Sequence, residues 1–302
     1  MIFAILTLLS WTAGTFAFLT ASRKIYPALL NRVRLGLAAV ITFIAACIYQ
    51  GLFPWQLVMQ PSVESWIFLG LSGIVGLTIG DYFGFTALRI LGARRHSVVA
   101  TTAPIFAALG AFTFANEGLT LHTLVGMVIC IGGVLLAMSS ARERQAVEGE
   151  GYGTYTMGVL MGIGAAVGQG IGLVLAKLGM HSSGVKIDPV QATFMRMSIG
   201  FLSTYVLDLT QRGPLRPLSE AFVDKEGRNG MFLGVLFGPT LGVTMSLAAA
   251  ATLDLAVAQT IFSMTPVVIT LVAILRERRF PPLISLVGLA VAIAGVVILV
   301  AG

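Results

Sequence analysis

The stretch LISLVGLAVAIAGVVILVAG, at positions 283–302, carries no charged side chain. An uncharged apolar stretch of about 18 residues or more can cross the hydrocarbon core of a bilayer as a helix. Only 11% of the whole chain is charged and 57% is hydrophobic, whereas an ordinary soluble domain is about 25% charged. The chain is therefore predicted to be an integral protein of the lipid bilayer. The lack of alternation between apolar and polar residues favours helices over a membrane barrel.

Ten membrane spans are expected from the apolar stretches. They cover residues 1–21, 31–52, 65–87, 95–115, 119–139, 155–177, 189–210, 231–252, 255–275 and 282–301. The first stretch has no positive residue before it, and Arg23 and Lys24 follow it. This order differs from that of a signal peptide, so the first span is expected to be retained.

The positive charges predict how the spans are oriented. Sixteen of the 19 Lys and Arg residues lie beside alternate connections, and the opposite face has only Lys177 and Lys186. Positive residues stay on the cytoplasmic side, which places both termini outside. The net charge of +6 is then a topology signal, and no nucleic-acid partner is expected. The compact chain fits a multi-pass protein of a bacterial inner membrane.

The chain repeats itself at a constant offset in residue number. The matching positions are Pro27 with Pro189, Arg34 with Arg196, Pro104 with Pro266, Gly126 with Gly288, Gly133 with Gly295, and the row Ser72, Gly76, Gly80, Gly84 with the row Gly234, Gly238, Gly242, Ser246. Because five spans is an odd number, the second copy enters the membrane from the opposite side. The predicted fold is an all-α integral membrane protein, with ten transmembrane helices as two inverted five-helix repeats.

The predicted repeats cover residues 1–139 and 155–302, and residues 140–154 form a cytoplasmic linker. Inverted repeats are typical of secondary transporters, whose substrate site lies near the membrane midplane between the repeats. Small residues at a spacing of four let helix backbones approach closely, so the two glycine rows are interpreted mainly as packing surfaces. The rows suit packing within or between subunits equally well, and they predict no oligomeric state.

These motifs resemble the drug/metabolite transporter superfamily, EamA type. The resemblance rests on the ten-helix pattern, the proline and arginine seven residues apart in spans 2 and 7, and a proline followed by a glutamate in spans 4 and 9 (Pro104 to Glu117, Pro266 to Glu277). It covers nearly the whole chain. It implies a basket of helices around a central cavity, lined mainly by spans 1, 3, 4, 6, 8 and 9. Members of this superfamily export amino acids, related metabolites or drugs.

Pro104 and Pro266 are expected to break spans 4 and 9 near mid-membrane. Proline cannot donate a hydrogen bond to the carbonyl four residues back, so the carbonyls of Ala100 and Phe262 are predicted to be free. Polar pairs stand beside both breaks: Ser97 with Thr101, and Gln259 with Ser263. A free carbonyl and a polar stripe near the midplane form a candidate substrate-binding surface. The alternative is that the hydroxyls simply satisfy the kinked backbone.

Further candidate substrate-binding residues are aromatic or polar side chains of other spans. They are Trp11, Thr15 and Phe18 in span 1, Tyr82 and Phe85 in span 3, Gln169 in span 6, and Ser246 in span 8. The aromatic rings can stack on an apolar or aromatic substrate. Contact with lipid or with the core is the alternative interpretation for each ring.

Ionisable groups inside spans are costly, so each is a functional candidate. Asp81 is interpreted either as a carrier of a coupling proton or as the ion-pair partner of Arg34 or Arg89. Glu117, in a short external turn, is expected to cap a helix, and a role in proton coupling or in an ion pair is the alternative. Arg196 is expected to reach the outer interface and to anchor span 7 there, where an acidic group can pair with it. The alternative is that Arg196 holds a substrate carboxylate, which its planar fork suits.

The predicted function is that of a secondary transporter that exports small metabolites such as amino acids by alternating access, with protons as a candidate coupling ion. A multidrug, nucleotide-type or sugar carrier of the same fold is the alternative. An intramembrane enzyme or a receptor is the alternative from another class. The sequence has no GxxxxGK[ST], GxSxG or HExxH motif, and its three histidines are scattered. Accordingly no catalytic residue, metal site or cofactor is predicted.

Overall fold

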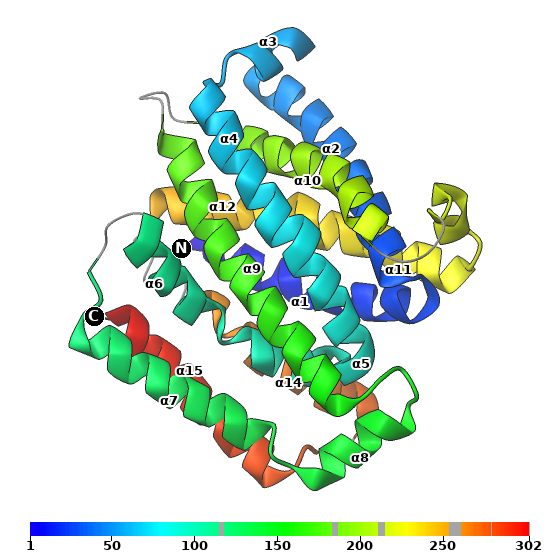
Figure 1. The fold of residues 1–302 in the computed structure, drawn as a ribbon, viewed down its shortest axis with the longest axis vertical. Coiled ribbons are helices and arrows are strands. Elements are labelled where there is room, and N and C mark those ends of the chain that lie inside the picture. The colour runs from blue at the N-terminus through cyan, green and yellow to red at the C-terminus, as the bar shows by residue number, and fades with distance from the viewer. Residues whose placement is uncertain (115–117, 183–186, 211–214, 254–260, 279, 302) are drawn as a thin grey trace.

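The computed structural model describes residues 1–114, 118–182, 187–210, 215–253, 261–278 and 280–301. These residues form a bundle of helices and contain no strand (Figure 1). The α-helices are α1 (Ile2–Lys24), α2 (Pro27–Gln50), α3 (Pro54–Met59), α4 (Val63–Ser72), α5 (Asp81–Ala100), α6 (Ala103–Phe114), α7 (Leu121–Ala137), α8 (Ala141–Gly149), α9 (Tyr155–His181), α10 (Pro189–Thr210), α11 (Lys225–Val235), α12 (Thr244–Thr252), α14 (Thr265–Glu277) and α15 (Leu283–Ala301). Two π-helices, η1 (Gly73–Gly80) and η3 (Leu236–Val243), and a short 3-10 helix, η2 (Leu218–Phe222), complete the fold.

Six helical segments of the described residues are long and apolar enough to cross a membrane, and α7 with α8, which meet at 63°, would make a seventh. The apolar helices α6 and Thr265–Leu275 are shorter. The longest segment, Val63–Ala100, holds two helical stretches, because the backbone at Gly92 is not helical (φ 77°, ψ 170°). Residues with a Cβ rarely adopt a positive φ, so glycine suits this break.

The outer faces of the bundle expose large apolar side chains. Ile48, Val128 and Leu135 keep 77%, 70% and 67% of their surface exposed. Exposure of this kind on many helices is unfavourable in water and is expected where the helices face lipid. The structure therefore agrees with the membrane location that the composition predicts.

α7 and α15 pack side by side along their lengths (Figure 1). Small residues on both helices bring the backbones together. The contacting pairs are Gly126 with Leu299, Cys130 with Gly295, Gly133 with Ala292, and Ala137 with Gly288. The residue numbers rise along one helix as they fall along the other, so the two helices are antiparallel.

α2 and α10 form a second antiparallel pair. The ring of Phe43 packs on that of Phe194 with centroids 5.0 Å apart. Gly36 faces the ring of Phe201. Farther along the pair, the guanidinium of Arg32 lies 5.1 Å from the ring centroid of Tyr205.

The two π-helices stand where the glycine rows of the sequence lie. η1 packs on α9, where a Cβ added to Gly80 would lie 3.2 Å from the Cα of Gly168. η3 packs on α1, where a Cβ added to Gly14 would lie 3.1 Å from the backbone nitrogen of Gly238. Such contacts leave no room for larger side chains, as expected of glycine rows that serve helix packing. A π-helical turn inside a longer helix is rare and is often found at functional sites.

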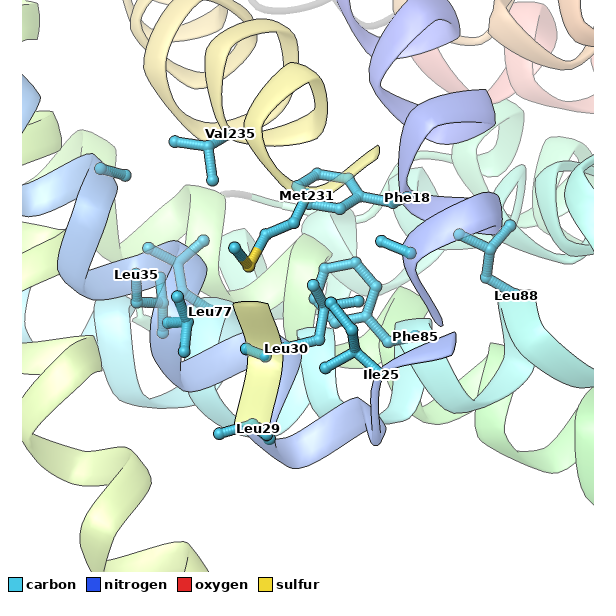
Figure 2. Packing of buried hydrophobic residues seen from close by; sticks show 14 of the residues in the cluster. Phe18, Ile25, Leu29, Leu30, Leu35, Leu77, Phe85, Leu88, Met231 and Val235 are labelled. Carbon is cyan, nitrogen blue, oxygen red and sulfur yellow. The ribbon is translucent and has the colours of Figure 1, made fainter. Parts of the chain in front are cut away.

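The largest buried apolar cluster joins helices from both ends of the chain (Figure 2). Phe18 of α1 packs edge-on against Phe85 of α5, with ring centroids 4.9 Å apart. Met231 of α11 and Leu30 of α2 are fully buried in the same cluster. This cluster fixes α1, α2, α5 and α11 relative to one another, and Phe18 and Phe85 also reach the cavity described below.

The segment predicted as a linker contains a helix, α8, that is docked onto the bundle. Glu143 of α8 is 3% exposed and accepts hydrogen bonds from Arg94 at 2.5 Å and from Arg95 at 3.1 Å. Beyond α8, the hydroxyl of Tyr155 donates to the carbonyl of Met138 at 2.7 Å. These contacts hold the connection between α7 and α9 against the end of α5.

Candidate functional site

A cavity of about 260 Å³ lies between the helices of the two halves. Its lining comes from α1, η1, α5, α6, α9, η3, α12 and α14, which cover all six spans that the family resemblance implies. α2 and α10 add one arginine each, Arg34 and Arg196. Ligand pockets commonly measure about 300 to 1,000 Å³, so this cavity lies just below that range and suits only a small molecule.

Both prolines stand at helix breaks beside the cavity. α5 ends at Ala100 and α6 begins at Ala103, one residue before Pro104. In the second half, α14 begins at Thr265, one residue before Pro266. Proline suits the first turn of a helix, because its missing N–H has no intrahelical partner there.

One of the two carbonyls expected to be free is occupied. The hydroxyl of Thr265 donates to the carbonyl of Phe262 at 2.6 Å, so the prediction of a free carbonyl at Phe262 is wrong. The turn before Pro266 lets a hydroxyl three residues ahead reach back to this carbonyl. Ala100, the equivalent position of the first half, lines the cavity.

Four hydroxyls in the cavity lining donate hydrogen bonds to backbone carbonyls. Their protons are donated to carbonyls of their own helices: Thr15 to Trp11 at 2.8 Å, Ser97 to Arg94 at 2.8 Å, Thr101 to Val98 at 2.6 Å, and Ser246 to Val243 at 2.8 Å. A hydroxyl oxygen keeps lone pairs after its proton is used, so each can accept a hydrogen bond from a ligand. Ser263 and Gln169 also line the cavity, and the exposed amide of Gln169 can both donate and accept.

Aromatic rings form two parts of the cavity wall. Trp11 packs against Phe262 with ring centroids 5.1 Å apart, and Phe18 packs against Phe85. Tyr82 is not among the lining residues, in contrast to the prediction, and its ring lies 5.8 Å from that of Phe83. Asp81, Gly84, Phe85 and Leu88 line the cavity. These positions share one face of α5, and Tyr82 lies about 100° away from Asp81 on that helix.

Arg34 and Asp81 form an ion pair in the lining of the cavity. The Nε of Arg34 donates to the Oδ1 of Asn31 at 3.0 Å, and the Nδ2 of Asn31 donates to the carbonyls of Leu77 and Thr78 in η1, both at 3.0 Å. The guanidinium also lies 4.9 Å from the ring centroid of Phe85. Arg34 is therefore held in place on several sides, and Asp81 keeps 36% of its side chain accessible.

Arg196 was expected to reach the outer interface, and the structure instead buries it at the cavity. Its side chain is 6% exposed, and it lines the cavity. Its carbonyl lies against Gly73 of η1, and its Nη2 lies 3.6 Å from the position of a Cβ on Gly76. The sequence gives the position of Arg196 along α10. It does not show that α2 and η1 pack on α10 and bury this part of the helix.

The sequence profile of the EamA-like transporter family matches residues 1–139 and 156–301. The chain belongs to the EamA-like transporter family. As an EamA-like transporter it is a multi-pass membrane protein and not an enzyme. The cavity is a candidate site for a small molecule in this transporter.

Two known proteins are similar to this EamA-like transporter. Purine permease 2 of Arabidopsis thaliana is 30% identical to it over 136 residues, which cover 44% of this chain and 37% of the permease. The matched region is thus well under two thirds of the permease. A protein of known crystal structure aligns with 98% of this chain and 94% of its own, with a TM-score of 0.62 and 20% identity. At that identity the likeness shows a shared fold alone.

Some predicted site residues lie outside the described parts of the chain. Some residues that line the cavity were not predicted. Glu117 and Gln259 lie outside the described parts of the chain. His96 and Phe262 line the cavity although neither side chain was predicted to do so. His96 directly precedes Ser97, and Phe262 directly precedes Ser263, but successive residues of a helix point about 100° apart, so adjacency alone gave no signal for either. Within the described residues, no group of three His, Cys, Asp or Glu side chains could hold a metal ion.

Proposed function

We propose that this protein is a secondary transporter that exports small metabolites such as amino acids by alternating access between two inverted five-helix repeats. The observation that carries the proposal is the cavity, because equivalent residues of both halves line it: Arg34 with Arg196, Thr101 with Ser263, and Pro104 with Pro266. In transporters built from inverted repeats, the substrate site lies between the repeats near the membrane midplane.

The contacts between α7 and α15 support a two-fold relationship between the halves. Gly133 contacts Ala292, and the equivalent positions of the opposite repeats are Gly295 and Cys130, which are also in contact. A symmetric pair of antiparallel helices at equivalent positions supports the proposed inversion of one half relative to the other.

The α2 and α10 pair supports the same relationship independently. Phe43 and Phe194 have Tyr205 and Arg32 as their equivalents in the opposite repeats, and these two residues are also in contact. The π-helices add a third correspondence. Each has eight residues, and their start points, Gly73 and Leu236, match under the repeat offset to within one position. The proposed repeats are residues 1–139 and 155–302.

Ten spans can be drawn on the helices of the two repeats. In the first half they are α1, α2, the stretch from α4 to Gly92, the stretch from Gly92 through α6, and α7. In the second half they are α9, α10, the stretch from α11 to α12, the span that includes α14, and α15. The positive-inside rule then leaves both termini outside.

The cavity wall supports a small substrate that is partly apolar and partly polar. Trp11, Phe18 and Phe85 can contact an apolar body, and Gln169 and the hydroxyls of Thr101 and Ser263 can bind polar groups. A free amino acid fits this description. A purine base is a second candidate, favoured by the aromatic wall and by the likeness to a purine permease over 136 residues.

The test is uptake into proteoliposomes of labelled amino acids and of labelled adenine, with and without a pH gradient, against protein-free liposomes. Saturable uptake of an amino acid that responds to the gradient is the expected result. Saturable uptake of adenine alone would replace the amino-acid assignment by the purine one. Uptake that ignores pH would remove protons from the proposal, and no saturable uptake of either class would contradict both substrate assignments.

Asp81 is the proposed carrier of the coupling proton, because it is an accessible carboxylate in the cavity lining. Asp81→Asn should then keep counterflow, which needs no proton, and lose accumulation driven by a pH gradient. Retained accumulation would leave Asp81 with the ion pair to Arg34 alone.

A further inference from the structure

Within the described parts of the chain, Arg196 is a buried cation without a hydrogen-bonded partner. Only 6% of its surface is exposed, and its Nε is enclosed without an acceptor. No acceptor for its other nitrogens is found among the described residues. A buried charge is costly unless it is paired and hydrogen-bonded, so this guanidinium is suited to pair with an anion.

The carboxylate among the cavity-lining residues, Asp81, already has an arginine partner. Asp81 forms its ion pair with Arg34. Arg34 has further fixed contacts with Asn31 and Phe85, which hold the ion pair on its own side of the cavity. Among the carboxylates and arginines that line the cavity, two arginines therefore face one carboxylate. One positive charge is left uncompensated, and it belongs to Arg196.

The surroundings of Arg196 leave its guanidinium open to the cavity. The side chain passes Gly76 of η1, where a Cβ would stand 3.6 Å from Nη2. A larger residue at this position would extend over the guanidinium. Gly76 and Arg196 both line the cavity, so the glycine leaves space beside the guanidinium at the cavity wall.

We propose that Arg196 is the anion-binding group of the cavity and that it binds a carboxylate of the substrate. This inference rests on the proposed transport function and narrows its substrate class to small monocarboxylates with an apolar or aromatic body. The fork of an arginine matches a carboxylate with two parallel hydrogen bonds. A single uncompensated charge matches a monoanion better than a doubly charged phosphate. The rings of Trp11 and Phe262 provide a surface for the rest of the molecule.

The test compares phenylacetate with phenylacetamide, which have nearly the same shape and differ in charge, by titration calorimetry on the purified protein. Phenylalanine serves as a second carboxylate. The wild-type protein is expected to bind phenylacetate about tenfold more tightly than the amide, or more, because a hydrogen bond to a charged group is stronger than a neutral one. Arg196→Gln should lose this preference by weakening phenylacetate binding and leaving amide binding unchanged, and Arg196→Lys should retain part of it.

Arg32→Gln is the matched control, because Arg32 is a buried arginine of α2 that does not line the cavity. It should keep the wild-type preference for phenylacetate. The melting temperature gives a second readout: phenylacetate should raise it for the wild-type protein and not for Arg196→Gln, since a ligand stabilises only a protein that binds it.

Three results would overturn the proposal. Arg196→Gln could keep the wild-type preference, it could weaken both probes equally, or the wild-type protein could bind neither phenylacetate nor phenylalanine. In each case, saturable uptake of adenine or of another neutral probe by the same protein in liposomes would leave the transport function standing. Failure of all uptake would contradict the proposed function itself.

Discussion

Gly133 of α7 lies so close to Ala292 of α15 that a Cβ added to the glycine would stand 2.2 Å from the backbone nitrogen of Ala292. The backbone of a neighbouring helix cannot give way as a flexible side chain can. This contact and its equivalent, between Gly295 and Cys130, hold the α7 and α15 pair together.

Gly133→Ala is therefore expected to destabilise the protein by about 1 to 3 kcal/mol, the usual cost of overpacking a tight interface. Gly132→Ala is the control, because a Cβ at Gly132 meets nothing within 4 Å. The measurement is the melting temperature in detergent, followed by size-exclusion chromatography after heating. Equal melting temperatures for the two variants would show that the close approach of α7 and α15 is absent in the protein.

Asp81→Asn is expected to lower the melting temperature, because it leaves Arg34 and Arg196 in the cavity without a carboxylate. Removal of one partner from a buried ion pair costs more than removal of both. The double variant Arg34→Gln/Asp81→Asn should thus recover part of the loss. A double-mutant cycle measures the coupling, and additive effects of the two substitutions would argue against the ion pair.

Thr101→Ala together with Ser263→Ala is expected to weaken substrate binding, because both hydroxyls line the cavity at equivalent positions of the two halves. Thr102→Ala is the control. Its hydroxyl bonds to the carbonyl of Val99 at 2.8 Å, much as Thr101 bonds to Val98, but Thr102 does not line the cavity. The measurement is the Kd of a transported substrate in well-folded protein. An unchanged Kd in the double variant would mean that these hydroxyls only satisfy the backbone at the break.

Glu143→Ala is expected to release α8 and to destabilise the protein by about 3 to 5 kcal/mol, because it leaves Arg94 and Arg95 without their buried carboxylate. Glu220→Ala removes an exposed ion pair with Arg216 and should cost less than about 1 kcal/mol. Limited proteolysis within residues 139–154 provides a direct readout, since a released α8 should be cut faster. Equal proteolysis of both variants and the wild-type protein would contradict the docking of α8 by Glu143.

Local features of the sequence were sufficient for the helical class and for much of the cavity lining. Uncharged apolar runs predicted membrane helices, and the repeated prolines predicted breaks at Pro104 and Pro266, where helices do begin anew. Most of the polar and aromatic candidates in the described residues line one cavity, among them Trp11, Gln169 and Ser263. These features depend on composition, spacing and the chemistry of proline, which act within a few residues.

The rotation of each helix about its own axis could not be predicted in the same way. Tyr82 does not line the cavity and His96 does, although both lie on the same helix, α5. Which face of α5 is turned inward depends on its packing against α9 and α1. The apolar residues of α5 are spread around the helix, so their spacing in the sequence does not show which face packs against α9 or α1.

The amino-acid sequence alone established that this chain is a helical membrane protein with repeated motifs, because hydropathy, charge and small-residue spacing are local quantities. The roles of the two equivalent arginines depended on how the helices pack in space. Arg34 pairs with Asp81, which lies 47 residues farther along the chain and on another helix. Arg196 has no acceptor for its Nε among the described residues. Two identical side chains in matching motifs differ in this way because their partners come from elsewhere in the chain, and an ion pair depends on distance in space.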